Sequence, residues 1–156
     1  MLSPIRLHLQ SPTAFPVVER ERDWEGVEGF FFALAGRCVD DSPTSRKAIW
    51  PRAIEEEANI ESLLMGALSD SARDPSKALQ ATLYLRKVAI YTGRFSTSLF
   101  EAAARKAGTG PTAARCLMYL GDISRARNEY ERAQSQFEEA RREYRSEEHT
   151  SELQSP

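Results

Sequence analysis

One segment of the chain recurs at a fixed distance along the sequence. The triplet 93–95 (GRF) aligns with the triplet 128–130 (NEY), which places Phe95 and Tyr130 35 residues apart. Each triplet joins one segment of helical periodicity to the next. A period of this length is typical of architectures in which pairs of helices stack on one another. The recurrence therefore constrains the fold more than the composition does.

Apolar residues at helical spacing predict helices along most of the chain. Residues 60–68 show the pattern most clearly, with apolar side chains at i, i+3, i+4, i+7 and i+8. Pro51 and Pro111 are placed to begin helices, and Gly93 and Gly108 are placed to end them. The predicted helices cover residues 19–39, 51–69, 75–91, 95–107, 111–126 and 129–144, with a polar linker at 40–45.

The N-terminal segment leaves two alternatives open. Ser3 followed by Pro4 is a typical helix start. Ile5, Leu7 and Leu9 alternate with polar residues, as they would in a strand. No later segment indicates a paired strand, so short antiparallel helix pairs are the expected building unit.

The second copy of the recurring segment has a definite pattern of residue sizes. Gly121 and Ala133 are small and allow two helices to approach closely, whereas Phe137 is large and is expected to fill the space between this repeat and the next. The pattern resembles the tetratricopeptide repeat (TPR), and the residues expected to pack the repeat are Leu117, Leu120, Gly121, Tyr130, Ala133, Phe137 and Ala140. The resemblance implies an all-α fold in which antiparallel helix pairs stack as a short TPR-like right-handed solenoid. Generic helical hairpins without a repeat lineage are the alternative.

The chain also departs from the TPR pattern. Leu117 and Ser124 stand where the family prefers bulky aromatic residues. In the first copy, Arg86 and Arg105 stand where small residues are expected. The second copy therefore carries the resemblance, and the first copy is degenerate.

Two further blocks, at residues 55–68 and 91–103, resemble fungal NB-ARC/NACHT–TPR proteins, which are STAND-type signalling ATPases. In that family a nucleotide-binding domain and a winged-helix region precede the repeats. The resemblance implies an N-terminal remnant or linker at 1–18, a helical junction at 19–74 and TPR-like repeats at 75–144, with further repeats in the parent protein. The chain has no G-x-x-x-x-G-K-[ST] phosphate loop, so only the scaffold role is carried over.

The C-terminal residues have no apolar periodicity. From Arg145 to Gln154 they resemble, residue for residue, the in-frame translation of a sequencing-library adapter. Residues 145–156 are therefore expected to be a non-native, disordered tail, and the natural protein is expected to continue differently after about Tyr144. Phe137 and Tyr144 would then lack the next repeat that should cover them, which favours aggregation.

The composition argues against several classes of function. With 21 Lys and Arg against 23 Asp and Glu, the chain lacks the basic excess of a nucleic-acid-binding protein. The longest apolar run, residues 30–35, is too short to cross a membrane, and no signal-peptide pattern is present, so a cytoplasmic protein is expected. Cys38 and Cys116 are expected to be buried and reduced. His8 and His149 have no evident catalytic partner, so no enzyme activity, metal or cofactor is expected.

The expected function is a non-catalytic scaffold that binds a protein or peptide. Stacked helix pairs form a concave groove, and the first-helix residues expected to line it are Arg115, Met118, Tyr119 and Asp122. The alternative is a structural linker that braces the upstream nucleotide-binding domain and has no external ligand. A polar groove of mixed charge would favour binding, and apolar packing on both faces would favour bracing.

Overall fold

The computed structural model describes residues 17–40 and 42–153, and in them every regular element is a helix. In chain order the helices are α2 (Val17–Arg37), α3 (Pro43–Ala48), α4 (Trp50–Glu55), α5 (Glu57–Ser69), α6 (Ser76–Tyr84), α7 (Arg86–Thr92), α8 (Thr97–Ala107), α9 (Pro111–Ala126) and α10 (Tyr130–Leu153). The prediction of an all-α fold is confirmed for these residues. The helix or strand considered for the first residues lies outside them.

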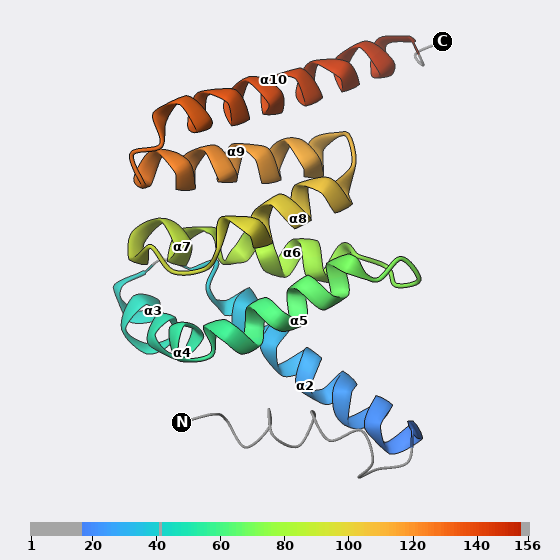
Figure 1. The fold of residues 1–156 in the computed structure, drawn as a ribbon, viewed down its shortest axis with the longest axis vertical. Coiled ribbons are helices and arrows are strands. Elements are labelled where there is room, and N and C mark those ends of the chain that lie inside the picture. The colour runs from blue at the N-terminus through green and yellow to red at the C-terminus, as the bar shows by residue number, and fades with distance from the viewer. Residues whose placement is uncertain (1–16, 41, 154–156) are drawn as a thin grey trace.

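The helices pack in a regular order along the molecule. α2 packs on α6, α5 packs on α8, and α7 packs on α9. α9 lies between α8 and α10 at one end, and α2 lies at the other (Figure 1). The buried apolar side chains form one continuous cluster from Phe31 in α2 to Ala140 in α10. Since a fully buried large apolar side chain stabilises a protein by about 1.5–3 kcal/mol, this cluster holds the stack together.

Several helix ends lie where local sequence signals place them. α9 begins at Pro111 and ends at Ala126, as predicted. Gly93 follows α7 with a φ of 68°, and Gly108 follows α8 with a φ of 74°. Both values lie in the left-handed region that glycine adopts without steric cost, so each glycine ends its helix there.

The polar linker predicted at 40–45 is wrong for its second half, because α3 begins at Pro43. The Ser42 side chain accepts a hydrogen bond from the backbone N–H of Ser45, at 3.2 Å, and so caps this helix. Pro43 occupies the first turn, where its missing N–H has no cost. Ser followed by Pro is thus the same helix start that was recognised at the N-terminus.

Two predicted helices are each divided in two. The helix predicted at 51–69 is interrupted at Glu56, between α4 and α5. The helix predicted at 75–91 is interrupted at Leu85, between α6 and α7. Just before the second break, the Thr82 hydroxyl donates to the Ala78 carbonyl at 2.8 Å. A hydroxyl bonded back to the preceding turn competes with the helical ladder and often bends a helix.

The last two helices also differ from their predicted bounds. α8 begins at Thr97 rather than at Phe95, because Phe95 has a φ of 64° and cannot continue a right-handed helix. α10 does not end at Tyr144 but extends to Leu153, so the disordered tail predicted from residue 145 is helical as far as that residue. Residues 145–153 contain neither Gly nor Pro, and nothing in them stops a helix.

Candidate binding groove

A hollow lined by both charged and apolar side chains lies between α7 and α9. Its volume is about 260 Å³, and the residues that line it are Arg86, Lys87, Ile90, Tyr91, Asp122, Arg125 and Ala126. The first four belong to α7 and the last three to α9. The hollow therefore lies where two helices that are distant in sequence pack side by side.

Arg86 joins the two walls of this groove. Its Nη2 donates to Oδ2 of Asp122 at 2.7 Å. Its guanidinium carbon also lies 4.3 Å from the centre of the Tyr119 ring, which is a cation–π contact. The Arg86 Nε is buried and has no acceptor among the described residues. The guanidinium is thus fixed by α9 but retains a donor without a partner.

Asp122 uses its second oxygen to hold Arg125. The Arg125 Nη2 donates to Oδ1 of Asp122 at 3.1 Å. The Asp122 side chain is only 14% exposed, whereas the Arg125 side chain is 65% exposed. One carboxylate therefore orients two guanidinium groups, and that of Arg125 remains open to solvent.

An aromatic residue forms one rim of the groove. Tyr91 is 61% exposed, and its ring stacks on that of Trp50, with the centres 5.9 Å apart and an angle of 28° between the planes. The guanidinium carbon of Arg46 lies 4.6 Å from the Tyr91 ring centre. These contacts from α3 and α4 hold an exposed tyrosine in one orientation beside the groove.

The structure brings together two of the four residues predicted to line a groove. Tyr119 and Asp122 both contact Arg86. Met118 packs against the apolar core, and Arg115 is exposed on α9. Arg86, Lys87 and Arg125 are groove residues that the sequence pattern does not predict. The available signal was that Arg86 stands where the TPR pattern has a small residue.

Among the residues predicted to pack the repeat, Gly121 of α9 and Phe137 of α10 meet at the interface of these two helices. Leu117, Leu120, Gly121, Ala133 and Ala140 are buried. Phe137 lies directly against Gly121, because a Cβ atom added to that glycine would come within 2.5 Å of the Phe137 ring. Phe137 thus packs inside its own helix pair, on α9, whereas the sequence analysis placed it between this repeat and the next.

Tyr130 differs from the other members of this set. It is 65% exposed, and its hydroxyl donates to Oδ1 of Asn128 at 2.9 Å. Asn128, which has a φ of 63°, turns the chain just before α10 begins. Tyr130 therefore lies on the surface at the start of the helix rather than in the helix pair.

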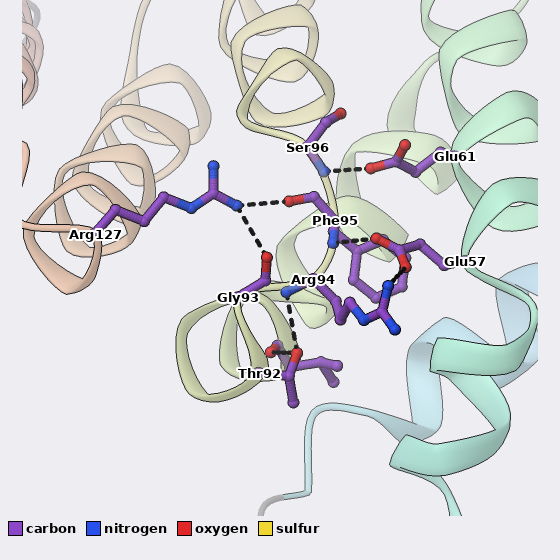
Figure 2. Close-up of polar contacts among 9 residues, drawn as sticks. Glu57, Glu61, Thr92, Gly93, Arg94, Phe95, Ser96 and Arg127 are labelled. Carbon is purple, nitrogen blue, oxygen red and sulfur yellow. Dashed lines mark hydrogen bonds and ion pairs between the residues drawn. The ribbon is translucent and has the colours of Figure 1, made fainter.

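A second group of polar contacts surrounds the turn between α7 and α8 (Figure 2). The Phe95 backbone N–H donates to Oε1 of Glu57 at 2.7 Å, and the Ser96 N–H donates to the Glu61 carboxylate. From the other side, Arg127 donates to the carbonyl oxygens of Phe95 at 3.0 Å and of Gly93 at 3.4 Å. The turn is thus held by α5 on one side and by the end of α9 on the other.

This turn has a structural role. The Phe95 side chain is 2% exposed, so its left-handed backbone is stabilised by burial of the ring as well as by the hydrogen bonds. The polar side chains around the turn bond to its backbone or, in the case of Arg94, to Glu57 at 3.4 Å. Their hydrogen bonds satisfy backbone groups that the turn leaves without helical partners. The turn therefore connects three parts of the stack and does not form a ligand site.

The described residues contain no group of three or more metal-ligating side chains. Cys38 and Cys116 are free and buried, as predicted. Burial raises the pKa of both thiols to about 11, an effect that Arg37 and Arg115 offset only in part. Reactive cysteines have lowered pKa values, so neither thiol is suited to nucleophilic chemistry. In the part of the chain that the structure describes, no helix has the length and apolar character required to cross a bilayer.

Comparison with known proteins finds no family model, curated protein or solved structure that matches this chain. The interpretation of the groove therefore depends on its own geometry and on the pattern of residues in the sequence.

Proposed function

We propose that the chain is a non-catalytic interaction scaffold built from TPR-like repeats, and that it binds a protein or peptide in the groove between α7 and α9. The observation that carries the proposal is the mixed charge of this groove, which Arg86, Lys87 and Arg125 line together with Asp122. Apolar packing across both faces would have favoured a bracing linker. An exposed polar groove beside an aromatic rim suits recognition of another chain.

Two regularities support the repeat interpretation. Gly93 and Asn128 lie 35 residues apart, and both have left-handed backbones, with φ values of 68° and 63°. Most polar contacts between distant residues join positions 31 to 38 apart in sequence. The contact of Arg73 with Glu28, at a separation of 45, is an exception. Contacts at about one repeat length are expected where each helix pair rests on the preceding one.

The proposal includes a cytoplasmic location and a STAND-type parent protein. In such a parent, an upstream nucleotide-binding domain and further repeats would accompany this groove. Residues 145–154 are given no role in binding, because of their resemblance to a translated adapter.

The test is selection of short peptides from a displayed random library. We expect peptides that bind saturably and compete with one another for one site. Tyr91→Ala removes the exposed rim and should weaken the selected peptides about tenfold, since truncating an interface tyrosine often costs more than 1 kcal/mol. Tyr130→Ala is the matched control, because Tyr130 is about as exposed as Tyr91 but lies at the start of α10.

Two results would contradict the scaffold proposal. One is a library that yields no saturable binder. The other is a set of binders that Tyr130→Ala weakens as much as Tyr91→Ala does, because their site would then be on α10.

A further inference from the structure

The groove carries an excess of positive charge that the scaffold proposal does not explain. Among the described residues that line it, three carry cationic side chains, Arg86, Lys87 and Arg125, and one, Asp122, carries a carboxylate. Residues 1–144 contain equal numbers of Lys plus Arg and of Asp plus Glu, so this local excess is not a property of the chain as a whole. Resting on the proposed function, we infer that the partner is an acidic peptide segment whose Asp or Glu side chain enters this groove.

The contacts of Asp122 show how the groove binds a carboxylate. The two Asp122 oxygens accept from Arg86 at 2.7 Å and from Arg125 at 3.1 Å. A guanidinium group has five N–H donors in a planar fork that matches carboxylate geometry. The Arg86 Nε has no acceptor among the described residues, and the Arg125 side chain is 65% exposed. Because the Arg86 Nε is buried, the exposed guanidinium of Arg125, which Asp122 orients, is the group that can donate to a second carboxylate.

The remaining walls favour a peptide over other anionic ligands. Ile90 and Ala126 supply apolar surface between the charges, and the exposed ring of Tyr91 lies at the rim. The volume of about 260 Å³ lies just below the range of about 300–1,000 Å³ that is usual for sites of complete small molecules. It accommodates one or two side chains of a longer ligand. Nucleic acid would require a more extended basic surface than these residues provide.

The charge composition of the peptides selected from the random library tests this inference. The selected peptides should be enriched in Asp and Glu compared with the starting library. Their affinity should fall as salt increases, because ions screen exposed charges. Replacing the acidic residues of a selected peptide by Gln and Asn should weaken binding at least tenfold.

A pair of matched double variants locates the effect on the protein. Lys87→Gln with Arg125→Gln removes two positive charges from the groove and should weaken an acidic peptide about tenfold. Lys77→Gln with Arg105→Gln removes two exposed positive charges from α6 and α8, and it should leave the affinity within about twofold. Thermal unfolding of both variants checks that each remains folded.

The outcomes separate this inference from the scaffold proposal. Peptides that bind in the groove without enrichment of acidic residues would overturn the inference and leave the scaffold. Equal losses in the two double variants would also overturn it, because only the overall charge would then matter. Displacement of the peptide by inorganic phosphate at equal concentration would assign the groove to phosphate groups instead. A library that yields no saturable binder would contradict both proposals.

Discussion

α8 and α10 align at a separation of 35 residues, but they carry different side chains at the same positions. Leu99, Phe100 and Ala103 of α8 are fully buried. The residues 35 positions later, Gln134, Ser135 and Glu138, are polar and exposed. α8 packs against α5, α6 and α9, whereas α10 packs against α9 (Figure 1). The same helix position is therefore apolar where helices cover it and polar where it faces solvent.

This difference bears on the expectation that the last helix pair exposes an apolar face. A polar outer surface is what allows the final unit of a stacked array to remain soluble. The apolar surface that α10 leaves exposed includes the rings of Tyr130 and Tyr144, which are 65% and 40% exposed. Tyr130 and Phe137 also line a shallow hollow of about 360 Å³ together with Arg125, Gln134 and Arg141. Charged and amide side chains interrupt that surface, which argues against strong aggregation.

The largest expected effect is a difference between α8 and α10 in the free energy of unfolding that is lost when an aligned side chain is truncated. Leu99→Ala should lower the free energy of unfolding by about 2–5 kcal/mol, because it leaves a cavity in a fully buried site. Gln134→Ala, at the aligned position, should change it by less than about 0.5 kcal/mol. Urea denaturation measures both values. Similar losses in the two variants would show that α10 is covered in the same way as α8.

The contact of Gly121 with Phe137 should be the next most sensitive feature. Gly121→Ala forces a Cβ atom against the Phe137 ring and should cost about 1–3 kcal/mol through overpacking. Gly66→Ala is the control, because no atom lies within 4 Å of a Cβ added there. That change should stabilise α5 by up to about 1 kcal/mol, owing to the higher helix propensity of Ala. Stabilisation by both substitutions would disprove the tight contact.

The interface of α9 and α10 contains a buried polar pair at a position where the preceding copy of the repeat has an apolar residue. The Ser124 hydroxyl donates to Oε1 of Gln136 at 2.8 Å, whereas the position 35 residues earlier is the buried Ala89. Ser124→Ala leaves the Gln136 amide without this partner and should cost about 1–2 kcal/mol. Adding Gln136→Leu should recover part of that loss, and a double-mutant cycle by urea denaturation measures the coupling. A coupling energy near zero would contradict the pair.

The smallest expected effect is a difference between Cys38 and Cys116 in how often local unfolding exposes the thiol to a labelling reagent. Both buried thiols should react slowly with iodoacetamide at pH 8, because their pKa of about 11 keeps them protonated. Cys116 in α9 should label up to about tenfold faster than Cys38, which follows the end of α2, a difference of about 1.4 kcal/mol in opening. Mass spectrometry of the labelled peptides gives both rates, and faster labelling of Cys38 would reverse the comparison.

The raised pKa values of the same two thiols predict that the stability of the protein falls at high pH. Their pKa values are raised from 9.0 to about 11 in the folded state, so the folded protein retains the protons longer. Their contribution to stability is therefore complete below pH 9 and is lost as the pH rises through about 11. The urea midpoint should fall across this interval, and a Cys38→Ala and Cys116→Ala double variant should lose less over the same interval.

The sequence predicted the parts of the fold that depend on neighbouring residues. Pro111 and Gly93 act within one turn of a helix, so the helix limits they indicate were found correctly. The break at Leu85 was not predicted, because it coincides with a side-chain hydrogen bond from Thr82 rather than with Gly or Pro. The start of α3 was missed although Ser42 and Pro43 are local signals, since they lay in a stretch assigned to a linker.

Of the four residues predicted to line a groove, Asp122 lines this hollow and Tyr119 contacts its Arg86 side chain. Tyr119 and Asp122 could be selected because they lie on one face of one helix. Their partner Arg86 lies 36 positions before Asp122, on another helix, and no local pattern pairs the two. In the aligned copies Arg86 corresponds to Gly121, so a charged residue replaced a small one where α7 meets α9. In the sequence this difference indicates degeneration of the repeat, whereas the structure shows an ion pair between Arg86 and Asp122 there.

The most direct test of the central claim locates a selected peptide on the protein. Titrating the ¹⁵N-labelled protein with that peptide and following the backbone amide resonances would show which helices it contacts. We predict saturable shifts concentrated in α7 and in the C-terminal half of α9, around Arg86 and Asp122. Shifts confined to the outer surface of α10, around Tyr130 and Phe137, would contradict the account.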